Sequence, residues 1–304
     1  MPEANTRRIS SHAALCAVGA AILFSTGGAA IKTASLTGLQ VASVRSGVAA
    51  IVLLLWVRGR VEWSWRVAGV GVVYAATLVL FVASTKLTTA ANAIFLQSTA
   101  PLYIAVLAPA LLGERFRPRD LVLLGAAVLG LAMCFAGSTA PTATAPNPGA
   151  GNLLGVACSM TWALTLLGLR GMARRGAHEA ISCVVAGNVF ACAAGATALW
   201  PLPTASAADW LMLGYLGAFQ IAGAYILLTR AAAHLPALKL SLLLLIEPVL
   251  NPIWTWVARG EEPGIWTLAG GAVIVVASIA QAMTPAWLGY EMSSATESQK
   301  DSES

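Results

Sequence analysis

One pattern of residues occurs twice in the chain, at 88–119 and at 235–263. In each copy a proline, Pro101 or Pro248, lies inside an apolar span, and a Gly-Glu pair ending in Glu114 or Glu261 follows that span. A constant offset of 147 residues carries Pro101 onto Pro248 and Glu114 onto Glu261. The pattern predicts an internally duplicated membrane protein, and duplicated bundles with interrupted helices are typical of secondary transporters.

Composition indicates how many helices cross the membrane. Hydrophobic residues make up 58% of the 304 residues and charged residues 10%, whereas about a quarter of a soluble domain is charged. Because a span takes about 20 residues, we expect an all-α membrane protein with ten transmembrane helices. The predicted spans are 11–32, 38–58, 65–85, 88–112, 118–137, 151–170, 179–200, 208–229, 235–258 and 264–284.

Lysine and arginine predict the orientation. If the N-terminus lies inside, the inner segments hold thirteen cations: Arg7, Arg8, Arg58, Arg60, Arg66, Arg115, Arg117, Arg119, Arg170, Arg174, Arg175, Arg230 and Lys300. The outer segments hold three: Lys32, Lys86 and Arg259. Cytoplasmic segments carry the excess of Lys and Arg, so both termini are expected in the cytoplasm. The expected location of the protein is a bacterial-type inner membrane. The net charge of +5 then follows from topology, and no nucleic-acid partner is expected.

The number of spans in each half predicts how the halves are related. Five is odd, so the second half begins on the opposite side of the membrane, and the two five-helix repeats are inverted. The predicted parts are a cytoplasmic N-terminus (1–10), a first repeat (11–137), an external linker (138–150), a second repeat (151–284) and a cytoplasmic polar tail (285–304).

Short motifs narrow the range of partners. The five cysteines lie within predicted spans without metal-ligand spacing, and no Walker A motif is present, so no cofactor is expected. The Gly151-x-x-x-Gly155 spacing is too weak a helix-pairing signal to predict a dimer. We therefore expect a monomer whose partners are the lipid bilayer and a small-molecule substrate.

The order and spacing of these motifs resemble one known family. The turn after the proline helix reads Leu112-Gly113-Glu114 in the first half, and Arg259 replaces the usual leucine in the second. The first helix of each half has an aromatic residue eight positions before a cation: Phe24 and Lys32, Trp162 and Arg170. Over roughly residues 11–284 the chain resembles the EamA-type transporters of the drug/metabolite transporter superfamily.

This resemblance implies ten helices in two inverted repeats and a transporter rather than an enzyme. Within the family the chain resembles in particular bacterial exporters of amino acids, aromatic ones included. The expected function is export of small organic metabolites by alternating access, with helices 1, 3 and 4 of each half around a central cavity and the fifth helices at the edge. Another metabolite or drug is the alternative substrate. An intramembrane enzyme or a channel is the alternative class, although its motifs are absent from the sequence.

Pro101 and Pro248 are candidate hinges. Each proline frees the carbonyl four residues earlier, and in a bilayer that group must face protein or a water-filled cavity. The alternative is a packing kink. Glu247, near the bilayer midplane, is predicted to bind a substrate ammonium group or to take up a proton. The alternative is a protonated structural acid, because an ionised carboxylate is costly there.

Trp162 is far from the predicted span ends and is the candidate for stacking on a substrate; the alternative is a packed core indole. Lys239 either snorkels towards the cytoplasmic end or meets an anionic group. Arg45 is expected to bond carbonyls or an acid of a neighbouring helix at the periphery. The remaining candidates for the cavity wall are aromatic or neutral polar residues of the central spans: Tyr74, Phe81, Asn92, Phe95, Gln97, Ser98, Tyr103, Phe219, Gln220, Tyr225 and Ser241.

Overall fold

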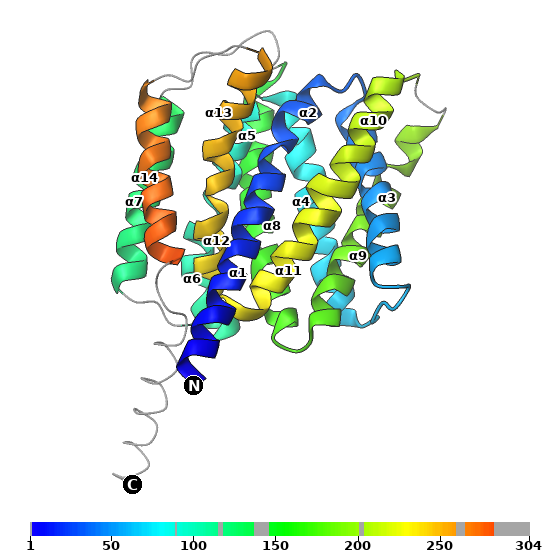
Figure 1. Cartoon of the computed structure of the whole chain (residues 1–304). Coiled ribbons are helices and arrows are strands. Elements are labelled where there is room, and N and C mark those ends of the chain that lie inside the picture. Colours follow the sequence, from blue (N-terminus) through cyan, green and yellow to red (C-terminus); the bar gives the residue numbers. More distant parts are fainter. Residues whose placement is uncertain are drawn as a thin grey trace, which may run out of the picture.

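The computed structural model describes residues 2–88, 90–114, 118–136, 146–200, 204–259 and 265–282, and all regular elements within them are helices (Figure 1). The first half forms α1 (Pro2–Ser25), α2 (Gly27–Thr33), α3 (Gly38–Trp56), α4 (Trp65–Leu87), α5 (Ala90–Gln97), α6 (Ala100–Leu112) and α7 (Pro118–Ala136). The second half forms α8 (Pro148–Ala173), α9 (Ala177–Ala194), η1 (Ala196–Leu199), α10 (Ala207–Tyr215), η2 (Leu216–Gly223), α11 (Ala224–His234), α12 (Ala237–Leu244), α13 (Ile246–Arg259) and α14 (Ile265–Ala282).

Seven helical stretches within the described residues are long and apolar enough to cross a membrane. They are Ser11–Thr33, Gly38–Trp56, Trp65–Leu87, Asn92–Leu112, Pro148–Ala173, Ala177–Ala194 and Ala207–His234. Each overlaps a predicted span, so the chain is a multi-pass helical membrane protein. The other three predicted spans coincide with α7, with α12 and α13 together, and with α14.

Two predicted segments lie largely outside the described residues. These are the tail at 285–304 and most of the linker, of which only 146–150 are described. Pro148 already belongs to α8, so the helix begins slightly earlier than the predicted repeat.

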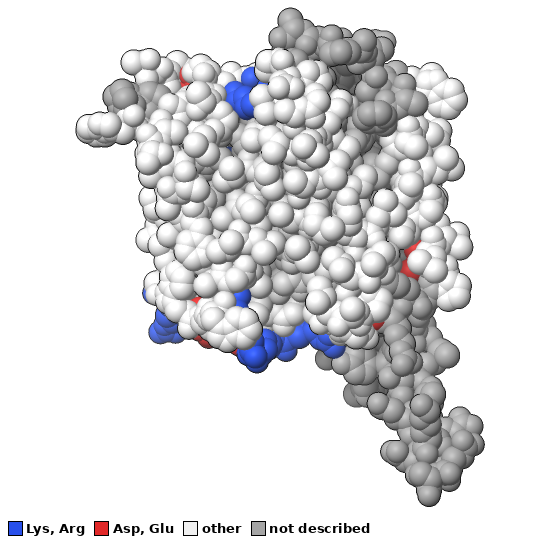
Figure 2. Space-filling view, turned by 180° about the vertical axis from the view of Figure 1, so that it is seen from behind, with Lys and Arg blue, Asp and Glu red and all other residues white. Residues whose placement is uncertain are grey.

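The cations gather at the two ends of the bundle. One end, here called the arginine end, lies where α3, α8 and α11 finish and α4 begins, and it carries Arg58, Arg60, Arg66, Arg170, Arg174, Arg175 and Arg230. At the other, the lysine end, α2 and α4 finish with Lys32 and Lys86. Figure 2 shows Lys and Arg along one rim, a small patch at the other, and an almost uncharged face between them. Such a belt suits the hydrocarbon core of a bilayer.

Local sequence explains several helix limits. Thr37 begins α3 with a capping box, in which the Gln40 backbone N–H donates to the Thr37 hydroxyl at 3.4 Å. Pro148 takes the first position of α8, where its missing N–H costs nothing. α6 ends at Gly113, whose φ of 65° lies in the left-handed region that glycine adopts readily.

Several helices change course near the middle of the bundle. α1 passes into α2 at Thr26, α5 into α6 at Ser98 and Thr99, and α12 into α13 at Leu245. Between α10 and α11, η2 winds as a π-helix, a feature frequent at functional sites. The interruptions at Ser98 and Leu245 are 147 residues apart, the offset that relates Pro101 to Pro248. The sequence duplication is therefore also a duplication of structure at this point.

The helices divide into a central group and an edge pair. α4 packs along α8 and α9, α1 along α11, and α3 along α9. α7 and α14 pack along each other at one edge of the bundle (Figure 1), the position predicted for the fifth helix of each half. Their backbones touch, since a Cβ on Gly130 would lie only 2.8 Å from the Gly270 carbonyl oxygen.

Candidate functional site

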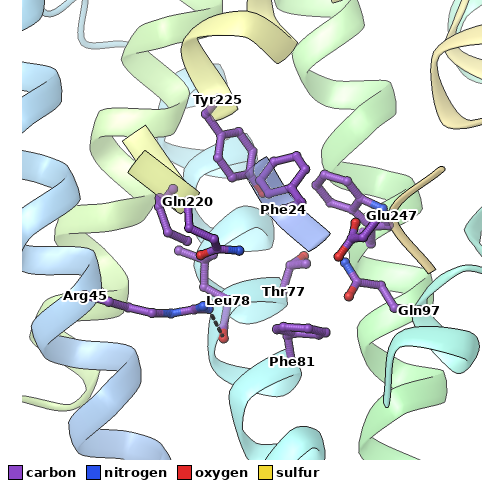
Figure 3. A pocket seen from close by; sticks show the side chains of 11 residues that line it. Phe24, Arg45, Thr77, Leu78, Phe81, Gln97, Gln220, Tyr225 and Glu247 are labelled. Atoms are coloured by element: carbon purple, nitrogen blue, oxygen red, sulfur yellow. Dashed lines mark hydrogen bonds between the residues drawn. The ribbon is translucent and has the colours of Figure 1, made fainter. Parts of the chain in front are cut away.

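A small cavity lies inside the bundle at the level of the helix interruptions (Figure 3). Its volume is about 30 Å³, and its walls come from α1, α3, α4, α5, α8, η2, α11 and α13. The lining residues are Phe24, Arg45, Thr77, Leu78, Phe81, Gln97, Trp162, Gln220, Ile221, Tyr225 and Glu247. A water needs roughly 10–15 Å³ of such space. In this conformation the cavity therefore has room for two or three waters and for no organic solute.

Aromatic rings form one wall. Phe24 of α1 meets Tyr225 of α11 edge to face, with ring centroids 5.1 Å apart, and it meets Trp162 of α8 at 6.0 Å. Tyr74 lies behind Tyr225 at 4.6 Å, and its hydroxyl accepts a hydrogen bond from Asn188 at 3.0 Å. Each such ring pair contributes about 0.5–1.5 kcal/mol beyond area burial. The aromatic wall is thus formed before any solute enters.

Arg45 brings a guanidinium group to the same cavity. The residue is 1% exposed, and its Nη2 donates to the Leu78 carbonyl oxygen at 3.2 Å. Its Nε and Nη1 have no hydrogen-bond partner among the described residues. η2 lies directly on α3 here, because a Cβ on Gly217 would be 2.6 Å from the Arg45 carbonyl oxygen. This close approach places Gln220 of η2 at the cavity beside Arg45 (Figure 3).

The acceptors of the cavity are amides and a carboxyl group. The Oε1 atoms of Gln97 and Gln220 are buried without a hydrogen-bond partner in the described part of the chain. Glu247 is the second residue of α13, directly before Pro248, and is buried. In Figure 3 Glu247 and Gln97 lie on the side of the cavity opposite Arg45. Arg45 and Gln220 therefore face Gln97 and Glu247 across the cavity.

The interruption in the first half is satisfied by a neighbouring helix. Pro101 has no N–H, so the Gln97 carbonyl, four residues earlier, lacks its helical donor. The Ser159 hydroxyl of α8 donates to that carbonyl at 3.3 Å and lies 2.8 Å from the Thr99 hydroxyl. α8 thereby supports the segment from which the Gln97 side chain reaches the cavity.

The structure places the predicted site residues in several parts of the bundle, and Tyr103 and Phe219 do not line the central cavity. Several line the central cavity: Phe81, Gln97, Trp162, Gln220, Tyr225 and Glu247. Tyr74 lies one ring behind the wall. Asn92 is near the lysine end, where it donates to the Thr88 hydroxyl at 3.4 Å. Lys239 and Ser241 are buried in α12, towards the arginine end, and Ser241 donates to the Leu238 carbonyl at 2.9 Å.

Phe95, Ser98 and Pro101 line a different cavity, between α5, α6 and α7. Its volume is about 270 Å³, and its wall is almost entirely apolar. The other lining residues are Leu96, Thr99, Leu102, Leu124, Ala127, Val128, Leu131, Ala132 and Leu245. Pro101 therefore lines an apolar void beside α7, and only Gln97 of this segment reaches the central cavity.

Five residues that line the central cavity were not predicted for its wall: Phe24, Arg45, Thr77, Leu78 and Ile221. The prediction that Arg45 bonds a carbonyl group of a neighbouring helix is confirmed, but Arg45 is also fully buried and lines the cavity, which was not predicted. Phe24 is not among the predicted wall residues. It had a signal, since the aromatic–cation spacing makes it the counterpart of Trp162. Thr77, whose hydroxyl lies 3.1 Å from that of Thr165, belongs to no sequence motif that could have identified it.

Interrupted membrane helices around a buried cavity with aromatic and polar walls define a membrane transporter. The chain belongs to the EamA-like transporter family, whose profile matches residues 11–136 and 149–282. The family comprises transporters, so the protein is not an enzyme.

Curated relatives with a named transport function match only a short part of this chain. The pseudopaline exporters CntI of Pseudomonas aeruginosa strains PAO1 and UCBPP-PA14 are each 37% identical to this chain over 76 residues, which is 25% of this chain and 26% of theirs. The match thus spans about a quarter of the curated relatives. A crystal structure described only as that of a protein has a TM-score of 0.70, at 23% identity, over 92% of this chain and 98% of its own. That likeness shows a shared fold.

Proposed function

We propose that the protein is a secondary transporter that exports small organic metabolites, most of all amino acids with aromatic or apolar side chains, across the inner membrane. The observation that carries this proposal is the central cavity, in which Phe24, Trp162 and Tyr225 form an apolar wall between the polar groups of Arg45 and Glu247. Export as the direction is supported by the short match to the pseudopaline exporters.

The proposed architecture has ten crossings in two inverted repeats. α7, the α12–α13 pair and α14 run between the same two ends as the seven apolar stretches (Figure 1). With these three, each half crosses five times, and α8 begins at the lysine end whereas α1 begins at the arginine end. The positive-inside rule then assigns the arginine end and both termini to the cytoplasm. One chain is the proposed transporting unit.

Alternating access is supported by polar contacts that join the helices at both ends of the bundle, which we propose as its closures. At the arginine end Arg170 pairs with Glu114 at 2.9 Å, and at the lysine end Lys32 donates to the Thr88 carbonyl at 2.7 Å. The interruptions at Thr26, at Ser98 and at Leu245 lie between these closures. Rotation of the short helices about such interruptions opens one end while the other stays bonded.

Transport into liposomes tests this function. Purified protein is reconstituted and screened with the twenty labelled amino acids, with and without a pH gradient. Trp162→Ala should lower transport of aromatic solutes several-fold, because a ring contact is worth about 0.5–1.5 kcal/mol beyond area burial. Trp200→Ala, at an exposed position outside the helices, is the matched control and should leave transport unchanged. Parental rates for every solute in Trp162→Ala would show that the indole is only packed.

Glu247→Gln separates the roles open to this carboxyl group. We propose that it binds the ammonium group, so the amide variant should weaken both solute exchange and gradient-driven accumulation. Loss of accumulation with intact exchange would instead identify a coupling proton, because an amide does not titrate. Retention of both would identify a structural acid, since a neutral carboxyl and an amide offer similar hydrogen bonds.

The orientation has its own test. In a background without native cysteines, Pro146→Cys, just before α8 at the lysine end, should react with an impermeant thiol reagent from outside the cell. Arg60→Cys should react only after permeabilisation, because it lies at the arginine end. Both positions are exposed. Equal labelling of the two sites from one side would contradict the proposed arrangement.

A further inference from the structure

Arg45 is a fully buried cation without an acidic partner in the described part of the chain. Ion pairs between described residues join Arg170 to Glu114 and Arg175 to Glu179, and neither pair includes Arg45. A guanidinium group has five N–H donors, and Arg45 uses one of them, on the Leu78 carbonyl oxygen. Nε and Nη1 remain without a partner among the described residues.

Such an arrangement is costly in the folded protein. A buried charge requires a counter-charge and full hydrogen bonding to offset its desolvation. Intramembrane cations therefore mark paths for solutes or ions more often than they stabilise a fold. The unused donors of Arg45 thus indicate a group that is present only part of the time.

Arg45 does not reach towards the membrane surface. It lies seven residues into α3, which is about 10 Å from the lysine end at 1.5 Å per residue. A snorkelling arginine extends along its helix towards the nearer surface. Figure 3 instead shows the guanidinium pointing across the bundle into the cavity, next to Leu78 and Gln220.

We propose that Arg45 binds a carboxylate group of the transported solute, an inference that rests on the proposed transport through this cavity. A planar guanidinium donates two parallel hydrogen bonds to a carboxylate, which fixes the orientation of the ligand. The solute's apolar part then lies against Phe24, Trp162 and Tyr225, and its cationic part faces Glu247 and Gln97 on the opposite side.

The charges of the cavity favour a carboxylate over a phosphate group. Of the lining residues, Arg45 is the only cation and Glu247 the only acid. A phosphate group with nearly two negative charges would leave charge uncompensated beside Glu247. A solute with one carboxylate and one ammonium group places each charge opposite its complement and adds no net charge to a buried site.

Three related probes test this assignment on the purified full-length protein in lipid nanodiscs. Calorimetric titration compares L-phenylalanine, L-phenylalaninamide, which lacks the carboxylate, and phenylacetate, which lacks the ammonium group. The parent protein should bind the two carboxylates about tenfold or more tightly than Arg45→Met does, because a charged hydrogen-bond pair is lost. Binding of the amide should be the same in both. Arg66→Met, at an exposed arginine of the arginine end, is the control and should behave as the parent.

Folding of the variant is checked separately by thermal unfolding. Arg45→Met should be at least as stable as the parent, because it removes a buried charge without a partner. If Arg45→Met does not fold, Arg45→Lys replaces it; the lysine keeps the charge but lacks the planar fork, so binding of the carboxylates should still weaken.

The outcomes separate the two proposals. Carboxylate binding that depends on Arg45 supports the inference, even if only phenylacetate binds and an amino-acid substrate is thereby contradicted. If neither carboxylate binds the parent, or if the Arg45 variant binds both as the parent does, Arg45 is not the anchor. In the last case solute binding in the cavity stands, and the role of Arg45 alone is overturned.

Discussion

The arginine end and the lysine end, the two proposed closures of the bundle, join their helices with different chemistry. At the arginine end one ion pair joins four helices. Arg170 lies 2.9 Å from Glu114 and donates from Nη1 to the carbonyl oxygens of Ala232 and Ala233 at 2.7 and 2.9 Å. The second oxygen of Glu114 accepts the backbone N–H of Ala237 at 2.8 Å. The last residues of α8 and α11, the turn after α6 and the start of α12 therefore meet at one centre.

At the lysine end, separate hydrogen bonds join the helices in pairs. Lys32 donates to the Thr88 carbonyl and Lys86 to the Ala34 carbonyl, both at 2.7 Å. Asp209 accepts the backbone N–H and the hydroxyl of Ser35 at 3.0 and 2.8 Å. No ion pair occurs at this end between residues that the structure describes. Glu261, the sequence counterpart of Glu114, lies outside them.

This difference shows how much of each closure depends on a single side chain. Loss of one partner in the Arg170 centre affects all four segments at once, and it leaves a charge behind. Loss of one bond at the lysine end affects one helix pair, and the remaining bonds persist. Single substitutions should therefore have unequal effects at the two ends.

The largest effect is expected for Arg170→Gln. It leaves the largely buried Glu114 carboxylate without its cation, and removing one partner of a buried pair costs about 3–5 kcal/mol. Unfolding in mixed micelles measures this loss of stability. Arg175→Gln is the matched control within the chain: its 3.7 Å pair with Glu179 is exposed, and such surface pairs contribute about 0–1 kcal/mol. Equal losses for both variants would show that the Arg170 centre has no special role.

A smaller loss is expected for Lys32→Met. The variant keeps the apolar stem and removes one charge-assisted hydrogen bond to a backbone carbonyl, which is worth about 1.5 kcal/mol at a half-exposed site. Lys86→Met should behave alike, because Lys86 makes the equivalent bond to Ala34. The same micelle titration applies. A loss for Lys32→Met as large as that for Arg170→Gln would contradict the contrast between a single centre and separate bonds.

The smallest effect is expected for Ser159→Ala, at neither end. This variant removes the hydroxyl that bonds the Gln97 carbonyl, and one neutral hydrogen bond contributes about 1 kcal/mol. Stability should fall slightly, and transport in liposomes should change in both directions equally, because the interruption at Ser98 serves both closures. Thr161→Ala, whose hydroxyl bonds the Cys158 carbonyl within α8, is the control. A change in one direction only would assign Ser159 to one closure.

Much of the helix arrangement is predictable from sequence, because it depends on features that are periodic or long. The offset of 147 residues locates the interruptions at Ser98 and Leu245 as well as Pro101 and Pro248. The edge positions of α7 and α14 follow from their small, apolar composition. The break at Thr26 and the π-helix η2 have no such marker, since neither contains a proline. They depend on contacts with other helices, such as that between Gly217 and α3.

Residues of the cavity wall could be predicted from sequence where their type is unusual for the middle of a membrane span. Trp162 and Glu247 are unusual at mid-span, and both line the cavity. Arg45 was misjudged because sequence indicates depth but not the direction in which a helix turns a side chain. Its direction depends on how α3 packs against its neighbours, such as η2 at Gly217. Asn92 and Ser98 were plausible for the same reason, yet they face other neighbours.

The contact between α7 and α14 has a mechanical consequence. At Gly130 the two helices approach so closely that a Cβ there would meet both the Gly270 carbonyl oxygen and the Ile274 side chain, and close packing of this kind resists displacement. α7 belongs to the first half of the family match and α14 to the second. We therefore expect α7 and α14 to move as one unit, so that a tilt of one half is passed to the other. In the proposed transport cycle such a pair prevents the two halves from opening independently.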